Sequence, residues 1–153
     1  MRNRFIFHVL LPTLLTVALF AATIFLLVVP AMERSILERK REMIRELTTS
    51  AWNILASLEE DVTRGKLSRE EAQQQAVRQI RNLHYGPAMK DYFWVNDLQP
   101  RMVVHPYRYD LEGRDLSEMR DPDGKPLFVE FVRTARAHGE GFVAYRWQWK
   151  DDP

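Results

Sequence analysis

Cysteine is absent from the 153-residue sequence, which excludes a disulfide scaffold, a thiol catalyst and a zinc site with cysteine ligands. Common catalytic motifs are also absent: there is no Gly-x-Ser-x-Gly elbow, no glycine-rich phosphate loop and no His-Glu-x-x-His pair. The histidines do not show the spacing of metal ligands; they are His8, His84, His105 and His138. We therefore expect no enzymatic activity, no catalytic residues, no metal site and no cofactor.

An excess of one charge is lacking as well. The chain has 22 basic and 21 acidic residues, and Arg2 and Arg4 are the only charges among its first thirty residues. The remaining 123 residues carry 20 basic and 21 acidic side chains, whereas a nucleic-acid-binding protein usually shows a basic excess. We therefore expect no nucleic acid among the partners. The 46% hydrophobic and 28% charged content is ordinary for one folded domain.

A long apolar run follows the first four residues. Phe5 to Val29 contains no charged side chain and exceeds the ~20 residues that a helix needs to cross a bilayer. A cleaved signal peptide has a shorter apolar region of ~7–15 residues, and the segment 28–32 is a poor cleavage site. The run predicts an uncleaved transmembrane signal anchor over residues 5–30. The charges leave its orientation open, because basic residues lie on both sides of it.

The segment 31–64 predicts one long helix, since it contains neither glycine nor proline. The apolar run could continue straight into it, apart from Pro30 at the junction. Apolar residues recur every seven positions at Leu37, Ile44, Ala51 and Leu58, with Leu47 and Ile54 interleaved. This seam suits a partner helix, and hence a homodimer through the long helix, or the domain that follows. Lys40 and Asp61 interrupt the pattern, which does not favour a continuous coiled coil.

The remaining sequence predicts further helices and an antiparallel sheet. Gly65 ends the long helix, and Ser68 with Glu71 forms a capping box for a second helix. Period-two patterns then predict strands, separated by a turn and a long loop. The expected order is a strand at 91–97, a turn at 98–100, a strand at 101–105, a loop at 106–125, a helix at 126–138 and a strand at 141–149. The chain stops at Pro153, where a further strand is expected, so we interpret the sheet as incomplete and the sequence as cut short.

Amphipathic aromatic residues gather on the predicted strands and suggest a ligand pocket. Alternation places Tyr92, Trp94 and Asn96 on one face of the first strand, and Tyr145 and Trp147 together on the last, with Arg146 on the opposite face. Burial in the core is the open alternative for these rings. Their polar tips suit a small ligand, and His105 ends a strand where it can donate to a carboxylate, as neutral imidazole or as imidazolium. The predicted ligand-binding residues are Tyr92, Trp94, His105, Tyr107, Tyr145 and Trp147.

Five segments of the sequence resemble the single Cache domain of bacterial receptors. They are Lys90–Asp97, Met102–Pro106, Gly113–Ser117, Asp121–Lys125 and Gly139–Val143, and the resemblance covers about residues 33–149. It implies an α+β fold, with a PAS-like antiparallel sheet at 90–149 behind the long helix and a single Cache domain at 31–153. It also implies a domain outside the cytoplasm, with residues 1–4 inside. Members of the family bind small molecules, often short organic acids.

The resemblance implies the membrane-anchored sensing portion of a bacterial receptor, of the chemotaxis or two-component type. Its partners would be a small carboxylate and the inner membrane, with the domain facing the periplasm. Family members continue into further strands, a second membrane span and an output domain, so we interpret this sequence as a fragment or a truncated protein. Two alternatives remain open: a membrane-anchored structural or interaction domain without a ligand, and a periplasmic enzyme.

Overall fold

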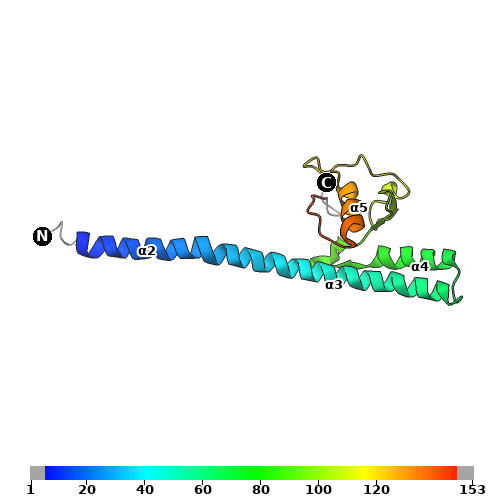
Figure 1. Ribbon diagram of the computed structural model, residues 1–153, viewed down its shortest axis with the longest axis horizontal. Coiled ribbons are helices and arrows are strands. Elements are labelled where there is room, and N and C mark those ends of the chain that lie inside the picture. The colour runs from blue at the N-terminus through cyan, green and yellow to red at the C-terminus, as the bar shows by residue number, and fades with distance from the viewer. Residues whose placement is uncertain (1–5, 148–153) are drawn as a thin grey trace. The chain divides into compact units, whose positions relative to one another are not determined.

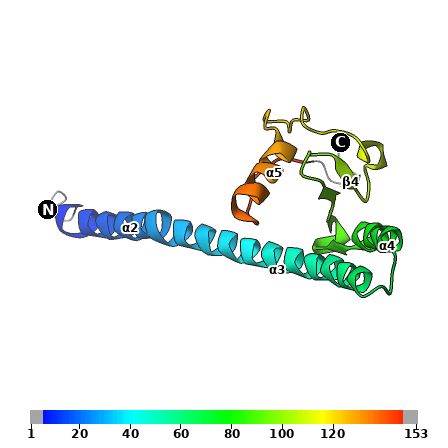
Figure 2. The ribbon, with the colours of Figure 1, turned by 45° about the vertical axis from the view of Figure 1, so that its right-hand side comes forward.

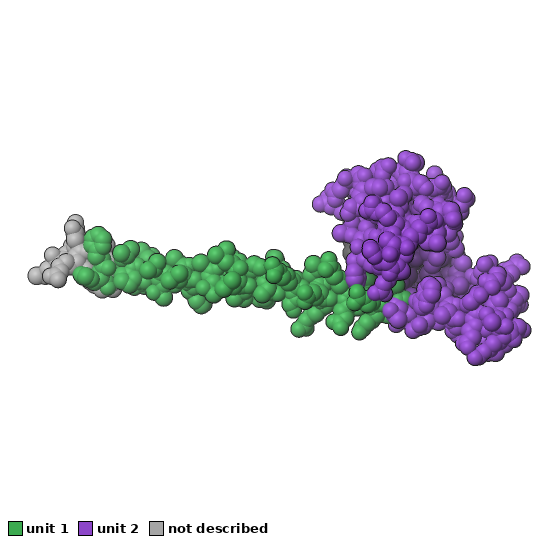
Figure 3. Space-filling model, in the orientation of Figure 1, with its two compact units in different colours: residues 1–48 green, residues 49–153 purple. Residues whose placement is uncertain are grey.

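A computed structural model describes residues 6–147 of the chain, which divides into two compact units, residues 1–48 and 49–153 (Figure 3). The predicted α+β class is confirmed. Figure 1 shows the order of elements, which is η1 (Ile6–Leu10), α2 (Leu11–Thr23), η2 (Ile24–Val28), α3 (Val29–Thr63), α4 (Arg69–Asn82), β1 (His84–Tyr85), η3 (Pro87–Met89), β2 (Asp91–Tyr92), β3 (Val95–Asn96), β4 (Met102–Val104), η4 (Tyr109–Leu111) and α5 (Leu127–His138).

Pro30 does not interrupt the helix. The helix runs without a break from Leu11 to Thr63, and the π-helical segment η2 lies directly before Val29 and Pro30. A proline inside an α-helix clashes with the carbonyl four residues earlier, here that of Leu26. A π turn is wider than an α turn and is one of the known sites where a helix bends around such a clash. The apolar run and the long helix are therefore one continuous element.

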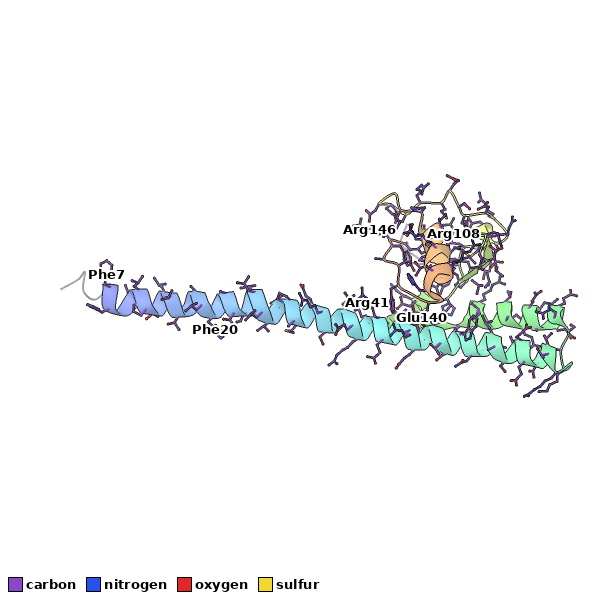
Figure 4. All side chains as sticks on the ribbon, viewed as in Figure 1. Phe7, Phe20, Arg41, Arg108, Glu140 and Arg146 are labelled. Atoms are coloured by element: carbon purple, nitrogen blue, oxygen red, sulfur yellow. The ribbon has the colours of Figure 1, made fainter. Side chains whose placement is uncertain are left out.

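The apolar part of this helix has the length and composition of a membrane span. It includes a window apolar enough to cross a bilayer, and none of that window is buried within the protein. Phe7 and Phe20 project from the helix with their rings exposed (Figure 4). The hydroxyls of Thr16 and Thr23 donate to the carbonyls of Pro12 and Leu19, each at 2.9 Å, so these two polar side chains are satisfied within the helix.

The C-terminal part of α3 pairs with α4, which runs alongside it (Figures 1 and 2). The predicted capping box is confirmed, because the Ser68 hydroxyl accepts from the Glu71 N–H and the Glu71 carboxylate accepts from the Ser68 N–H. At the first residue of α4, both Nη atoms of Arg69 donate to the carboxylate of Glu59 on α3, at 3.0 and 2.9 Å. These contacts fix the turn between the two helices and the pairing of their adjoining ends.

The predicted seven-residue seam divides into two parts. Ala51 and Leu58 are buried, and Ala51 packs in a cluster with residues of α4 and β4. Leu37 and Ile44 are 50% and 41% exposed. Of the two uses that the sequence left open, this part of the seam serves the domain that follows, because that domain covers Leu58. The exposed part of the seam, at Leu37 and Ile44, remains open to a partner helix.

The strands form two small antiparallel sheets, β1 with β2 and β3 with β4. The predicted single strand at 91–97 is thus divided into two, and the strand β1 was not predicted. Phe93 and Trp94 lie at the division and pack in different clusters, Phe93 with Ile80 and Trp94 with Phe128. Because the two adjacent rings pack in different clusters, the backbone turns between them. The chain therefore pairs with β1 before this point and with β4 after it. The predicted hairpin with the 101–105 strand is confirmed for β3 and β4.

A second core cluster joins α5 to the long loop after β4. Its buried members are Met102, Leu111, Leu116, Leu127 and Phe128. Two of them belong to the predicted 106–125 loop, which also contains the short helix η4 and is therefore partly structured. The predicted helix at 126–138 is confirmed as α5, with Pro126 as its N-terminal cap and Gly139 ending it at φ 78°.

The predicted strand at 141–149 is wrong for residues 141–147, which form no strand, and residues 148 and 149 lie outside the described residues. This segment is attached by other contacts. The Arg146 N–H donates to the Asp121 carboxylate at 3.1 Å, and the Lys125 ammonium donates to the Ala144 carbonyl. A strand needs a neighbouring backbone to complete its ladder, and these side-chain contacts replace that ladder within the described residues.

Two glycines at positive φ permit a comparison of stability. Gly65 and Gly86 have φ of 71° and 72°, but a Cβ on Gly86 would lie 1.9 Å from the Asp91 Oδ2, whereas nothing lies within 4 Å of one on Gly65. We expect Gly65→Ala to cost about 1 kcal/mol of unfolding free energy through its positive φ. Gly86→Ala should cost about 1–3 kcal/mol more, because Gly86 combines φ 72° with ψ −178°, which only glycine adopts readily, and because the new Cβ meets Asp91. Thermal unfolding of the full chain in detergent, followed by circular dichroism, measures both. Equal losses would contradict both the backbone strain and the clash with Asp91 at Gly86.

Candidate functional site

A cavity of about 890 Å³ opens in the second unit, in the size range of small-molecule sites. Three parts of the chain form its wall: the β1–β2 hairpin with Trp94, the long loop, and the segment before Gln148. The lining residues are Tyr85, Asp91, Tyr92, Trp94, Arg108, Met119, Arg120, Asp121, Pro122, Tyr145, Arg146 and Trp147. The wall therefore combines aromatic rings with three guanidinium groups and two carboxylates.

All six residues predicted to bind a ligand belong to one network of ring contacts. The centroid distances are 6.2 Å for Tyr92–Trp94, 5.1 Å for Tyr92–His105, 5.0 Å for Tyr92–Tyr107, 5.9 Å for Trp94–Tyr145 and 6.2 Å for His105–Trp147. Several of these pairs are edge-to-face, the arrangement that aromatic quadrupoles favour. Four of the six line the cavity, whereas His105 and Tyr107 lie behind its wall.

His105 is turned toward the backbone of its own loop. Only 1% of its surface is exposed. Its Nδ1 accepts hydrogen bonds from the N–H groups of Tyr107 and Arg108, at 3.2 and 3.0 Å. The ring therefore carries its proton on Nε2, which is buried and has no hydrogen-bond partner among the described residues. His105 fixes the turn that brings Arg108 to the cavity.

Burial also decides the charge of His105. Removal from water lowers its pKa from 6.5 to about 4, and the positive charge of Arg108 adds to this shift. The carboxylates of Asp110 and Glu112 oppose it with a smaller effect. Of the two protonation states that the sequence left open, the neutral imidazole is therefore the one present at neutral pH.

Cationic groups at the cavity come from arginines that the sequence analysis did not select. Arg108 donates through Nε and Nη2 to the two carboxylate oxygens of Asp110, both at 2.8 Å. Arg146 lies 3.2 Å from Asp123, and Arg120 lies 3.9 Å from Glu118. Figure 4 shows Arg108 and Arg146 in the same unit. A usable signal for Arg108 was its place three residues after His105, at the start of the long loop predicted at 106–125.

The position predicted for Arg146, on the face opposite Tyr145 and Trp147, is not what the structure shows. All three residues line the same cavity. The prediction relied on strand alternation, and residues 141–147 do not form a strand.

Two tyrosine hydroxyls supply neutral donors. Burial raises the pKa of Tyr145 and of Tyr92 above the ordinary value of 10.0. The indole of Trp147 lies beside the Tyr92 hydroxyl and opposes that shift, although its N–H does not reach hydrogen-bond geometry. Both hydroxyls therefore keep their protons at neutral pH and can donate hydrogen bonds.

These observations define a class of protein: an α+β ligand-binding domain with an aromatic and cationic cavity, preceded by a helix able to span a membrane. A family described as Single Cache domain 2 matches residues 36–152, and the chain belongs to this family. The chain is 42% identical over 122 residues to the methyl-accepting chemotaxis protein McpP of Pseudomonas putida, covering 80% of this chain and 22% of that protein.

Other relatives belong to signalling proteins as well. The sensor histidine kinase MctS of Rhizobium johnstonii is 31% identical over 121 residues, which cover 78% of this chain and 25% of the kinase. A solved periplasmic sensor domain of a chemotaxis protein is 46% identical, with a TM-score of 0.69, and the match covers 73% of this chain and 76% of that one. A solved Cache chemosensory domain described as recognising carboxylic acids is 37% identical, with a TM-score of 0.73, and the match covers 78% of this chain and 80% of that one.

The comparisons confirm that the chain contains a Cache sensor domain of the kind found in chemoreceptors and sensor histidine kinases. The chain spans about a quarter or less of the length of the two curated relatives. The assignment therefore concerns the sensor portion.

The neutral state of His105 predicts a pH dependence of stability. The unfolded chain takes up a proton on this residue near pH 6.5, but the folded chain does so only near pH 4. The contribution of neutral His105 to the free energy of unfolding is therefore fully present above pH 6.5 and is lost as the pH falls toward 4. The loss is at most about 1.4 kcal/mol per pH unit, because one proton is involved. Chemical unfolding of the full chain at several pH values between 7 and 4.5 measures this slope.

His105→Asn is the matched control, because its Oδ1 replaces the Nδ1 acceptor and does not titrate. We expect its stability to change less than that of the natural chain between pH 6.5 and 4.5. The carboxylates whose pKa is lowered, such as Asp121 and Asp110, lose their contributions below this range. Parallel curves for both proteins would contradict the assignment of the slope to His105.

Proposed function

We propose that the chain is the extracytoplasmic sensing portion of a bacterial membrane receptor and that its cavity binds a small carboxylic acid. The observation that carries this proposal is the meeting of Arg108 with protonated Tyr92 and Tyr145 in one aromatic cavity. A carboxylate that leaves water needs compensation by charge or by several hydrogen bonds, and these groups provide both. The carboxylic acid recognition described for a solved neighbour supports the same ligand class.

The proposed roles follow from position. Arg108 would hold the carboxylate, and the hydroxyls of Tyr92 and Tyr145 would donate to it. The indole rings of Trp94 and Trp147 would cover a short carbon tail, because they line the same wall. Acids of two to four carbons, such as acetate, propionate and pyruvate, are the proposed ligands. His105 and Tyr107 would act from behind the wall by holding the turn and the Tyr92 ring.

The proposed topology has residues 1–4 in the cytoplasm, residues 5–30 across the inner membrane and the Cache domain at 31–153 in the periplasm. The apolar window of the continuous helix supports the span. The description of a 46% identical neighbour as a periplasmic sensor domain supports the location of the domain. Its role is ligand binding rather than catalysis.

Replacing Arg108 tests the proposed ligand site. Arg108→Met removes the cation but keeps the backbone N–H that donates to His105. Loss of a charge-assisted hydrogen bond should weaken propionate binding about 10–100-fold. Titration calorimetry of the full chain in lipid nanodiscs measures the affinity. Arg133→Met is the matched control, because Arg133 pairs with Glu130 on α5 and does not line the cavity.

The outcomes separate the three functions. Unchanged affinity in Arg108→Met would remove Arg108 from the site. No binding of acetate, propionate or pyruvate by the natural chain would favour the anchored interaction domain. Chemical conversion of the acid during the titration would favour the enzyme.

We also propose that two chains associate through the exposed part of the seam, at Leu37 and Ile44. A membrane anchor confines two chains to one plane and raises their effective concentration, which supports association through a short surface.

Cysteine crosslinking tests this association, because the natural chain has no cysteine. In membranes, Ile44→Cys should crosslink to a second chain, whereas Glu42→Cys, about 200° around the helix, should not. Gel electrophoresis without reductant measures the dimer fraction. A dimer from Glu42→Cys alone would show that the chains meet on another face.

A further inference from the structure

One carboxylate oxygen of Glu112 receives hydrogen bonds from two separate parts of the second unit. The His105 N–H donates to Glu112 Oε1 at 2.9 Å, and Arg81 Nη2 donates to the same oxygen at 2.6 Å. Both charged side chains are partly buried, with 30% of Arg81 and 25% of Glu112 exposed. Partial burial strengthens this pair relative to the fully exposed pairs of the chain.

Arg81 brings α4 into contact with the loop that follows β4. Besides its bond to Glu112, its guanidinium carbon lies 5.0 Å from the centroid of the Tyr109 ring, within the range of a cation–π contact. Its neighbour Ile80 is buried against Val104, the last residue of β4. The end of α4 therefore contacts both ends of the segment 104–112.

A short series of contacts leads from Glu112 to the cavity. Glu112 holds the backbone of His105, and the His105 ring accepts from the N–H of Arg108. The Arg108 side chain then lines the cavity, whereas Glu112 and Arg81 do not. The backbone that carries Arg108 is thus connected to the carboxylate of Glu112, which lies outside the cavity wall.

We propose that Glu112, held in place by Arg81, is a positioning residue that sets where Arg108 stands in the cavity. The inference rests on the proposed function of the cavity. Without the Glu112 carboxylate, the N–H of a residue that is 1% exposed loses its acceptor. A buried donor without a partner is costly, so the turn moves to expose it, and Arg108 moves with the turn. Recognition of a carboxylate by a guanidinium depends on geometry and weakens with such a shift.

Affinity for propionate tests this role in the full chain in nanodiscs. We expect Glu112→Ala to bind about tenfold more weakly, because it removes both bonds. Glu112→Gln keeps an acceptor oxygen for His105 and should lose only about threefold, as should Arg81→Met. Arg69→Met is the matched control, because it breaks the exposed pair between α4 and Glu59 away from the cavity, and its affinity should stay within about twofold.

The background of Arg108→Met distinguishes positioning from a general loss of structure. If Glu112 acts through Arg108, Glu112→Ala should cause no further loss of propionate affinity once Arg108 is absent. An equal loss in both backgrounds, or an unchanged affinity in all Glu112 and Arg81 variants, would overturn the proposal.

Hydrogen exchange gives a readout that needs no ligand. Mass spectrometry should show faster exchange of peptides covering 101–112 in Glu112→Ala and Arg81→Met, but not in Arg69→Met. If the natural chain binds no propionate, the proposed function fails, while this exchange still decides whether Glu112 holds the turn. Unchanged exchange in this segment would overturn the proposal. If Glu112→Ala does not fold, Glu112→Gln and Arg81→Met carry the same comparison.

Discussion

The carboxylate of Asp121 is the contact on which the cavity depends most. This buried side chain accepts the N–H groups of Asp123 and Lys125 on one oxygen and the N–H of Arg146 on the other. These bonds, led by that from Lys125, hold the pKa of Asp121 below its ordinary value. The carboxylate thus closes the 121–125 turn and attaches it to the segment that carries Tyr145 and Trp147. That segment has no ladder among the described residues, so Asp121 replaces a strand partner.

The sequence predicts best those features that depend on neighbouring residues. The capping box of Ser68 and Glu71 needs only three positions, and the end of α5 at Gly139 needs one positive φ. The meeting of Tyr92 and Trp94 was also predictable, because residues two apart on an extended chain share a face. The six predicted site residues do meet as one ring network, since aromatic residues on adjoining strands and loops pack together in a small core.

Features for which the local pattern allows two structures were not predictable from the sequence. The predicted strand at 91–97 is divided because Phe93 and Trp94 pack in different core clusters. No turn residue at this point of the sequence indicates the division. The direction of His105 depends on the N–H groups of Tyr107 and Arg108, which a strand-end histidine does not reveal. Pro30 predicted a break, yet the π turn before it lets the helix continue. In each case two structures were locally reasonable. Tertiary packing decides between them for the strand, whereas contacts within a few residues decide for His105 and Pro30.

The charges around the cavity bear on how the proposed site for an anion fits a domain with nearly balanced charge. Each lining arginine already has a carboxylate near it, Asp110 for Arg108, Asp123 for Arg146 and Glu118 for Arg120. Only Arg108, 30% exposed, is partly buried, and its pair with Asp110 spares the wall an unpaired cation; the pairs of Arg146 and Arg120 are exposed to water and weaker. An acid that enters the cavity would therefore share an arginine with the carboxylate already paired to it, or displace that carboxylate, rather than bind to an unpaired arginine. Asp110 and Asp123 lie on the turns that flank the cavity. A change of partner at Arg108 or Arg146 would therefore move the loops that carry these arginines, so that ligand binding and loop position would change together.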